Sequence, residues 1–160
     1  MQERTNTMQE RMNSLQERIN VAKTDPDAYK AMMALEAYLV KTSLTAKQKD
    51  LIKIRASQLN GCSYCIDLHT KEARKAGESE QRIYALSAWR ETPYFSEEER
   101  VLLALTEEVT LIQGRVSDIT YQEAKEKLAE KRLSEAMMAA IVINAWNRIG
   151  IATNMKPPLG

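Results

Sequence analysis

Apolar residues recur at intervals of three and four along most of the chain, a spacing typical of amphipathic helices. No stretch alternates apolar and polar residues as a half-buried strand would. The sequence therefore predicts an all-α fold, a single-domain helical bundle of seven or eight helices. Capping residues and helix breakers predict the helix boundaries. Four helices have both ends predicted: from the Thr45/Gln48 capping box to Asn60, from Cys62 to Ala76, from Ser79 to Arg90, and from the Ser96/Glu99 capping box to Gly114. Three more have a predicted start, at Asp25-Pro26, at the Thr120/Glu123 capping box and at Ser134.

The first twenty residues repeat with a period of seven. Met-Gln-Glu-Arg occurs at 1–4 and 8–11, and Leu-Gln-Glu-Arg follows at 15–18. This heptad pattern covers about three heptads, the shortest length at which it indicates a coiled coil. A frayed helix and a partner-binding helix both fit it. We expect an N-terminal extension at 1–20, a helical domain at 21–152 and a C-terminal tail at 153–160.

Composition narrows the classes of function. The 160 residues suit one domain, and a hydrophobic content of 44% is enough for a core. Charges of both signs are interspersed and the net charge is +1, so we expect binding to neither nucleic acid nor a membrane. No apolar run approaches the roughly 18 residues that span a bilayer, and no signal peptide is evident, so the expected location is cytoplasmic. Because thiols stay reduced there, two cysteines favour catalysis or metal binding over a structural disulfide.

The candidate chemistry lies in residues 61–69, which contain both cysteines and the only histidine of the chain. On a helix that starts at Cys62, Cys65 and His69 are four residues apart and share one face. An imidazole beside a thiol favours the thiolate, and a second thiol three residues away can form a disulfide with it. The helix N-terminus favours a thiolate at Cys62, whereas His69 favours one at Cys65. Residue chemistry alone leaves the choice of nucleophile open.

Three other interpretations compete with a redox pair. Two core cysteines and a buried histidine would be inert. A c-type haem site needs histidine directly after the second cysteine, which this spacing excludes. Cys62, Cys65 and His69 could supply three zinc ligands, but the chain has no other Cys or His, so a carboxylate or water would complete the shell. A zinc-binding or non-catalytic helical oligomerisation protein is therefore the alternative to an enzyme.

The motif Cys62-x-x-Cys65-x-x-x-His69, preceded by RASQLNG at 55–61, resembles the core of the AhpD-like alkylhydroperoxidases of the carboxymuconolactone decarboxylase superfamily. The segments ALSAWRETP at 85–93 and NAWNR at 144–148 resemble the same group. The resemblance implies a helical subunit that assembles into trimers or hexamers, and a peroxidase or disulfide reductase without metal or haem. It also implies that Cys65 attacks the peroxide, that Cys62 resolves the product, and that His69 belongs to a proton relay.

Two positions depart from the pattern of that group. A relay glutamate twelve residues before the first cysteine is replaced by Asp50, a carboxylate one methylene shorter. A histidine just before the second cysteine is replaced by Tyr64, which can donate a hydrogen bond but is a poor base at neutral pH. Glu36 interrupts an apolar helix face and could either join the relay or form an ion pair. For Trp89 and Trp146, packing in the core or at a subunit contact is expected over a place in the pocket.

These observations together predict an antioxidant thiol peroxidase or disulfide reductase that needs no cofactor. The Cys65 thiolate would attack a hydroperoxide, Cys62 would close a disulfide, and an external dithiol would reduce it. By the resemblance, that dithiol is lipoyl-type or thioredoxin-like. Several helices carry wide apolar stripes, including Met32, Leu35 and Leu39 and the run from Ile141 to Ile149, so we expect a homo-oligomer. From the trimers or hexamers that the resemblance implies, a hexamer is the specific prediction. The decarboxylase branch does not depend on the cysteine pair, so lactone decarboxylation is not expected.

Overall fold

The computed structural model describes residues 16–158, and the heptad repeat therefore lies mainly outside the described residues. Within this range the chain forms eight α-helices, two short 3-10 helices and no strand, which confirms the predicted all-α fold. None of the described helices is long and apolar enough to cross a bilayer. The elements are α2 (Val21–Thr24), α3 (Pro26–Val40), α4 (Ala46–Asn60), α5 (Ser63–Lys75), α6 (Glu80–Ala85), η1 (Leu86–Glu91), α7 (Glu97–Thr110), η2 (Ile112–Gly114), α8 (Asp118–Lys127) and α9 (Glu130–Thr153).

Helix starts with a strong local signal lie where the sequence predicts them. The Asp25 side chain accepts a hydrogen bond from the Ala28 backbone N–H at 3.1 Å, directly before Pro26 opens α3. The capping boxes at Thr45 and Ser96 are both complete. Each hydroxyl accepts a hydrogen bond from the backbone N–H three residues further on, and the side chain of that residue accepts one from the backbone N–H of the cap residue. These caps fix the beginnings of α3, α4 and α7.

Other predicted boundaries are wrong. The helix predicted from Ser79 to Arg90 is split into α6 and η1, with Ala88 in a non-helical conformation, and the Trp89 indole N–H donates to Glu107 at 2.8 Å. Ser117 rather than Thr120 caps α8, because the Thr120 hydroxyl instead donates to Glu108. Tertiary contacts therefore override local signals at both places.

Two further helix ends also differ from prediction. Helix α9 begins at Glu130, four residues before the predicted Ser134, and its N-cap residue Ala129 makes no side-chain hydrogen bond. Helix α7 ends at Thr110, and the separate η2 turn leads to the predicted stop at Gly114. The side chains of Ala129 and Leu111 gave no local signal for these ends.

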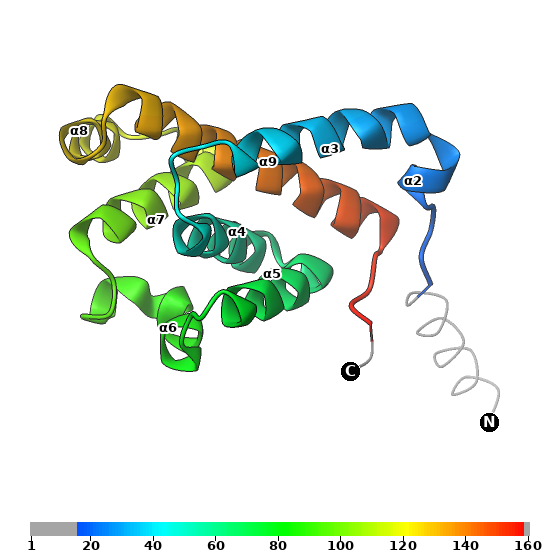
Figure 1. Cartoon of the computed structure of the whole chain (residues 1–160), viewed down its shortest axis with the longest axis horizontal. Helices are drawn as coiled ribbons and strands as arrows, with labels where there is room; N and C mark the ends of the chain where they lie inside the picture. Colours follow the sequence, from blue (N-terminus) through cyan, green and yellow to red (C-terminus); the bar gives the residue numbers. More distant parts are fainter. Residues whose placement is uncertain (1–15, 159–160) are drawn as a thin grey trace.

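Helix α4 lies near the centre of the fold and packs against α5, α7 and α9 (Figure 1). One buried apolar cluster joins α4 to α7 and α9, with Ile52, Leu105 and Ile143 among its members. A second cluster on another side of α4 includes Leu51 and surrounds Trp89, as expected for a core tryptophan. Because neighbours cover α4 on several sides, even some of its polar residues are buried.

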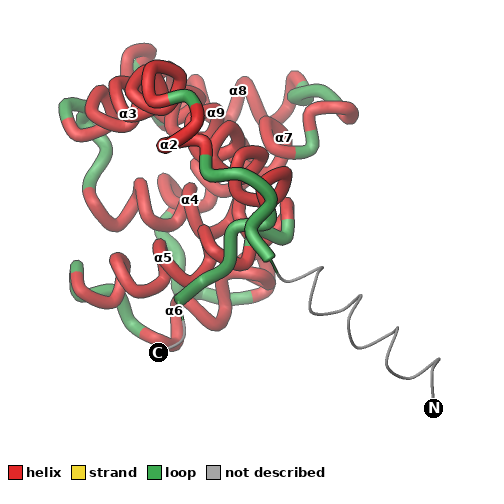
Figure 2. The backbone as a smooth tube through the Cα atoms, turned by 90° about the vertical axis from the view of Figure 1, so that its right-hand side faces the viewer, coloured by secondary structure: helices red, strands yellow, loops and turns green. Residues whose placement is uncertain are grey.

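The described N-terminal segment runs beside the end of α9 (Figure 2). The Arg18 backbone N–H donates to the Thr153 carbonyl at 2.8 Å, and the Asn154 side-chain amide donates to the Gln16 carbonyl at 2.8 Å. The two ends of the described chain are thereby joined close to the last turns of α9.

Candidate active site

The turn between α4 and α5 places the first cysteine at a helix start. Gly61 ends α4 in the left-handed conformation with φ 70°, as the Asn60-Gly61 pair predicts. The next residue, Cys62, is the N-cap of α5, and its sulfur accepts a hydrogen bond from the Cys65 backbone N–H at 3.4 Å. Both sulfurs therefore lie within the first turn of α5, as the three-residue spacing predicts.

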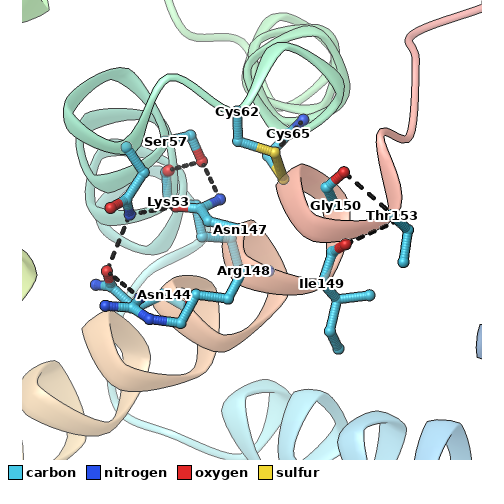
Figure 3. The surroundings of a disulfide bond; sticks show 11 residues. Lys53, Ser57, Cys62, Cys65, Asn144, Asn147, Arg148, Ile149, Gly150 and Thr153 are labelled. Carbon is cyan, nitrogen blue, oxygen red and sulfur yellow. Dashed lines mark hydrogen bonds between the residues drawn. A yellow bond between two sulfur atoms is a disulfide. The ribbon is translucent and has the colours of Figure 1, made fainter. Parts of the chain in front are cut away.

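Cys62 and Cys65 are joined by a disulfide, with their Cα atoms 5.4 Å apart, and both residues are buried (Figure 3). Gly150 of α9 lies directly against them. A Cβ atom at Gly150 would be 3.2 Å from the Cys62 sulfur and 3.7 Å from the Cys65 sulfur. Glycine is thus the residue that lets α9 approach the disulfide this closely. Gly150 is not predictable as a site residue from the sequence, since a glycine within a helical pattern has no distinctive spacing.

A chain of amide and hydroxyl hydrogen bonds holds α9 against α4 beside the disulfide (Figure 3). The Asn147 amide donates to the Ser57 hydroxyl at 2.9 Å, and that hydroxyl donates to the Lys53 carbonyl at 2.7 Å. The Asn60 amide donates to side-chain oxygens of both Asn144 and Asn147. Two of the three segments that resemble the AhpD-like group, 55–61 and 144–148, therefore hold each other in place.

His69 is buried one turn after Cys65, and its Nδ1 atom lies 2.8 Å from a carboxylate oxygen of Glu72. Since a carboxylate only accepts, Nδ1 carries the hydrogen, and the neutral ring keeps its lone pair on Nε2. Burial lowers the pKa of His69 below its ordinary value, and the Lys53 ammonium lowers it further, against the opposing effect of Glu72. A neutral imidazole able to accept a proton is the result.

Cys65 and His69 open onto a cavity of about 210 Å³ formed by α3, α4, α5 and α9. Most of its wall is apolar or aromatic. Tyr64, Glu36 and Trp146 also line it, so the structure brings these residues together with Cys65 and His69. The Trp146 ring packs edge-on against Tyr29, with centroids 5.5 Å apart. Trp146 therefore combines the expected packing role with a place in the pocket.

Two cavity residues were missed from the sequence. Lys53 lies three residues after Asp50 between two isoleucines, and it forms an ion pair with Glu36. Glu72 lies three residues after His69 on the same helix face, and that spacing could have identified it. For Lys53, a charged residue inside an apolar stretch was the available signal.

Asp50 is half-buried in α4 and is not one of the cavity-lining residues. Burial raises the pKa of Asp50 to about 6, with Lys53 opposing the rise and Glu72 adding to it. The Asp50 carboxyl group makes no hydrogen bond to residues 16–158. Asp50 therefore interacts electrostatically with Lys53 and Glu72, two residues of the cavity wall.

Arg55, before the motif, and Asp67, between Cys65 and His69, form ion pairs elsewhere. The Arg55 guanidinium donates to Glu107 at 2.7 Å rather than to a cysteine. Asp67 pairs with Lys71 at 2.8 Å on the outer side of α5. Within residues 16–158, no group of three or more His, Cys, Asp and Glu side chains is arranged to hold a metal ion.

Residues 26–108 match the carboxymuconolactone decarboxylase family. The chain is also 46% identical over 128 residues to the uncharacterized protein YdfG of Bacillus subtilis (strain 168), an alignment that covers 79% of this chain and 87% of YdfG. The chain therefore belongs to the carboxymuconolactone decarboxylase family.

Solved structures identify the branch of the family. ATU0492 from Agrobacterium tumefaciens is 39% identical to this chain, with a TM-score of 0.88 over 91% of this chain and all of that chain. ATU0492 is described as a protein of unknown function and a candidate antioxidant defence protein AhpD. An AhpD-core, peroxidase-related protein from Ralstonia eutropha JMP134 shares the fold at 17% identity, with a TM-score of 0.76 over 86% of this chain and 74% of that chain. The protein is an AhpD-like member of the superfamily.

Proposed function

We propose that the protein is a thiol-dependent peroxidase or disulfide reductase that acts through Cys62 and Cys65 without metal or haem. The observation that carries the proposal is the pairing of these two cysteines beside a largely apolar cavity that also contains the only histidine. The description of ATU0492 as a candidate antioxidant defence protein supports the same role.

Cys65 is the attacking residue in this proposal, because Cys65 lines the cavity and Cys62 is not among the described lining residues. Neutral His69 takes the proton from the Cys65 thiol. The sulfur then bonds to the terminal oxygen of a hydroperoxide while the O–O bond breaks. The departing alkoxide takes the proton held by His69 and leaves as an alcohol, or as water when the substrate is hydrogen peroxide.

Cys62 completes the oxidation of the pair. Its sulfur attacks the sulfenic acid on Cys65, the S–O bond breaks, and water leaves with the Cys62 proton as the disulfide forms. An external dithiol, lipoyl-type or thioredoxin-like, then reduces the disulfide by exchange and is itself oxidised to a disulfide. The external dithiol thus supplies the two electrons that reduced the hydroperoxide, and both cysteines return to the thiol form.

Asp50 and Tyr64 have supporting roles in the proposal. A carboxyl group whose pKa is raised to about 6 can exchange protons near neutral pH, which suits Asp50 as the counterpart of the relay glutamate. Since Asp50 lies outside the cavity lining, it would act through water. Tyr64 lines the cavity and would donate a hydrogen bond to a bound ligand.

A homo-oligomer, specifically a hexamer, belongs to the same proposal. Helix α3 exposes Leu35, Tyr38 and Val40, with 38%, 40% and 75% of their surfaces accessible. Ile141 and Ile151 of α9 are also about half exposed. Large apolar side chains left exposed on two helices are typical of subunit contacts. A cytoplasmic location fits a dithiol that must be returned to its reduced form.

The proposed function is tested by hydroperoxide consumption in the presence of a supplied dithiol, with dihydrolipoamide as the probe. Wild-type protein should consume hydroperoxide catalytically, and Cys65→Ser should reduce the rate to the uncatalysed background. Stoichiometric zinc that survives dialysis, together with equal rates for wild type and Cys65→Ser, would instead favour the zinc-binding or non-catalytic alternative.

A further inference from the structure

Lys53 occupies an unusual position for a lysine. Its side chain is only 11% exposed, and the neighbouring residues Ile52 and Ile54 are completely buried. Lysine is rarely buried to this extent, because removing an ammonium group from water is costly unless a partner compensates its charge. The compensating partner is Glu36, which reaches Lys53 from α3.

The Lys53–Glu36 pair lies within the candidate active site. Both residues line the cavity that contains Cys65 and His69. The charged or titratable groups around this ammonium are Glu36 from α3, Asp50 from α4, and Tyr64, His69 and Glu72 from α5. Helix α9 contributes Trp146, Ile149 and Gly150 to the wall, none of which is charged. Lys53 is therefore the cation placed among the reacting groups.

We propose that Lys53 is a further catalytic residue of this dithiol site, an inference that rests on the proposed peroxidase function. Its ammonium stabilises the negative charge of the Cys65 thiolate and then donates a hydrogen bond to the oxygen that leaves when the O–O bond breaks. Lys53 keeps its own proton throughout, since the proton on the product alcohol comes from Cys65 by way of His69. Glu36 offsets part of the positive charge of this ammonium.

A purely structural role for the pair, tying α3 to α4, makes a different prediction. If the pair only tied the two helices together, loss of either partner would disturb the site in the same way. If Lys53 acts through its charge, Lys53→Met and Glu36→Gln should have effects of opposite sign. The first substitution removes the positive charge, and the second leaves that charge less compensated.

His69 reports this difference directly, because it is the only histidine and gives a single imidazole signal in an NMR titration. Lys53→Met should raise the pKa of His69, and Glu36→Gln should lower it. In the reduced protein, Lys53→Met should slow alkylation of the reactive thiol at pH 7 by about tenfold, the effect of one pKa unit, whereas Glu36→Gln should not slow it. Lys71→Met, at an exposed lysine of α5, is the matched control and should change neither readout.

Shifts of the same sign in both variants, or no shift in Lys53→Met, would overturn the role of Lys53. Lys53→Gln repeats the test if the Met variant does not fold. Hydroperoxide turnover by the wild-type protein is measured in parallel. Absence of wild-type turnover would overturn the proposed function and with it the hydrogen bond to the leaving oxygen. Normal wild-type turnover with unchanged turnover and alkylation in Lys53→Met would overturn the inference about Lys53 alone.

Discussion

In the proposed reaction, the site depends on which ring nitrogen of His69 is free to accept a proton. Glu72 engages Nδ1 of His69, so Nε2 is the ring nitrogen that can take a proton. Burial and Lys53 keep the pKa of His69 below its ordinary value, so the ring is neutral at physiological pH. This arrangement can be tested one residue at a time.

His69→Ala removes both the proposed base and the ion-pair partner of the thiolate. We expect alkylation of the reduced protein near pH 7 to slow by about tenfold and the apparent pKa of the reactive thiol to rise. The measurement is the pH profile of the alkylation rate, with Thr70→Ala on the same helix as the control. If His69→Ala keeps the wild-type profile, His69 is not coupled to either sulfur.

Asp50→Asn tests the proposed relay carboxylate. Turnover should fall in this variant, because the carboxylate is lost. Asp50→Glu should preserve or improve turnover, because it keeps the carboxylate and gives it the length of the family's glutamate. Steady-state turnover of the two variants is the measurement. Wild-type turnover in Asp50→Asn would show that another carboxylate serves the relay, with Glu36 as the first candidate.

Asp50 should also affect stability in a pH-dependent way. The pKa of Asp50 is raised to about 6 in the folded protein. Ionisation of Asp50 therefore lowers the free energy of unfolding as the pH rises from about 4 to above 6, and below about pH 4 this loss is absent. Asp50→Asn should therefore be more stable than wild type at pH 8, by on the order of 1 kcal/mol after allowance for its partial exposure, and unchanged at pH 4. Denaturant unfolding at the two pH values measures the difference. A variant less stable at pH 8 would contradict the assigned cost of burial.

At the level of helices, the closeness of α9 to the disulfide depends on Gly150. In Gly150→Ala the added methyl group would lie 3.2 Å from the Cys62 sulfur, so either helix α9 or the sulfur must move. We expect a loss of about 1 kcal/mol in the oxidised protein, since overpacking outweighs the better helix propensity of alanine. Thermal unfolding measures this, with Gly114→Ala as the control because a Cβ there meets nothing within 4 Å. Equal melting temperatures for both variants would refute the tight contact.

The caps at Asp25, Thr45 and Ser96 and the turn at Gly61 were predictable because each depends on residues within four positions of one another. The same locality places Cys62, Cys65 and His69 on the first turns of one helix. The place of Lys53 and Gly150 in the site could not be predicted from local pattern alone. Lys53 belongs to the site because the fold brings Glu36 of α3 against it, and Gly150 belongs to it because the fold brings α9 against the disulfide. The break in the predicted helix from Ser79 to Arg90 has a similar origin in the contact between Trp89 and Glu107.

For the whole molecule, assembly is the main open prediction. Light scattering should give the mass of a homohexamer for the intact chain, since apolar side chains of α3 and α9 remain exposed in one subunit. A chain that starts at Val21 tests the contribution of the heptad repeat. A monomer in both redox states would contradict the assembly proposal, and a truncated chain of unchanged subunit number would show that the repeat is dispensable.

In the proposed reaction Cys65 takes an oxygen atom from a hydroperoxide, and Cys62 then forms a disulfide with it. This order of steps is tested by mass spectrometry after one equivalent of hydroperoxide is added to the reduced protein. Wild type should lose two thiols and form the Cys62–Cys65 disulfide, Cys62→Ser should stop at a sulfenic acid on Cys65, and Cys65→Ser should remain unoxidised. Two free thiols in the wild-type protein after this treatment would contradict a redox role for Cys62 and Cys65.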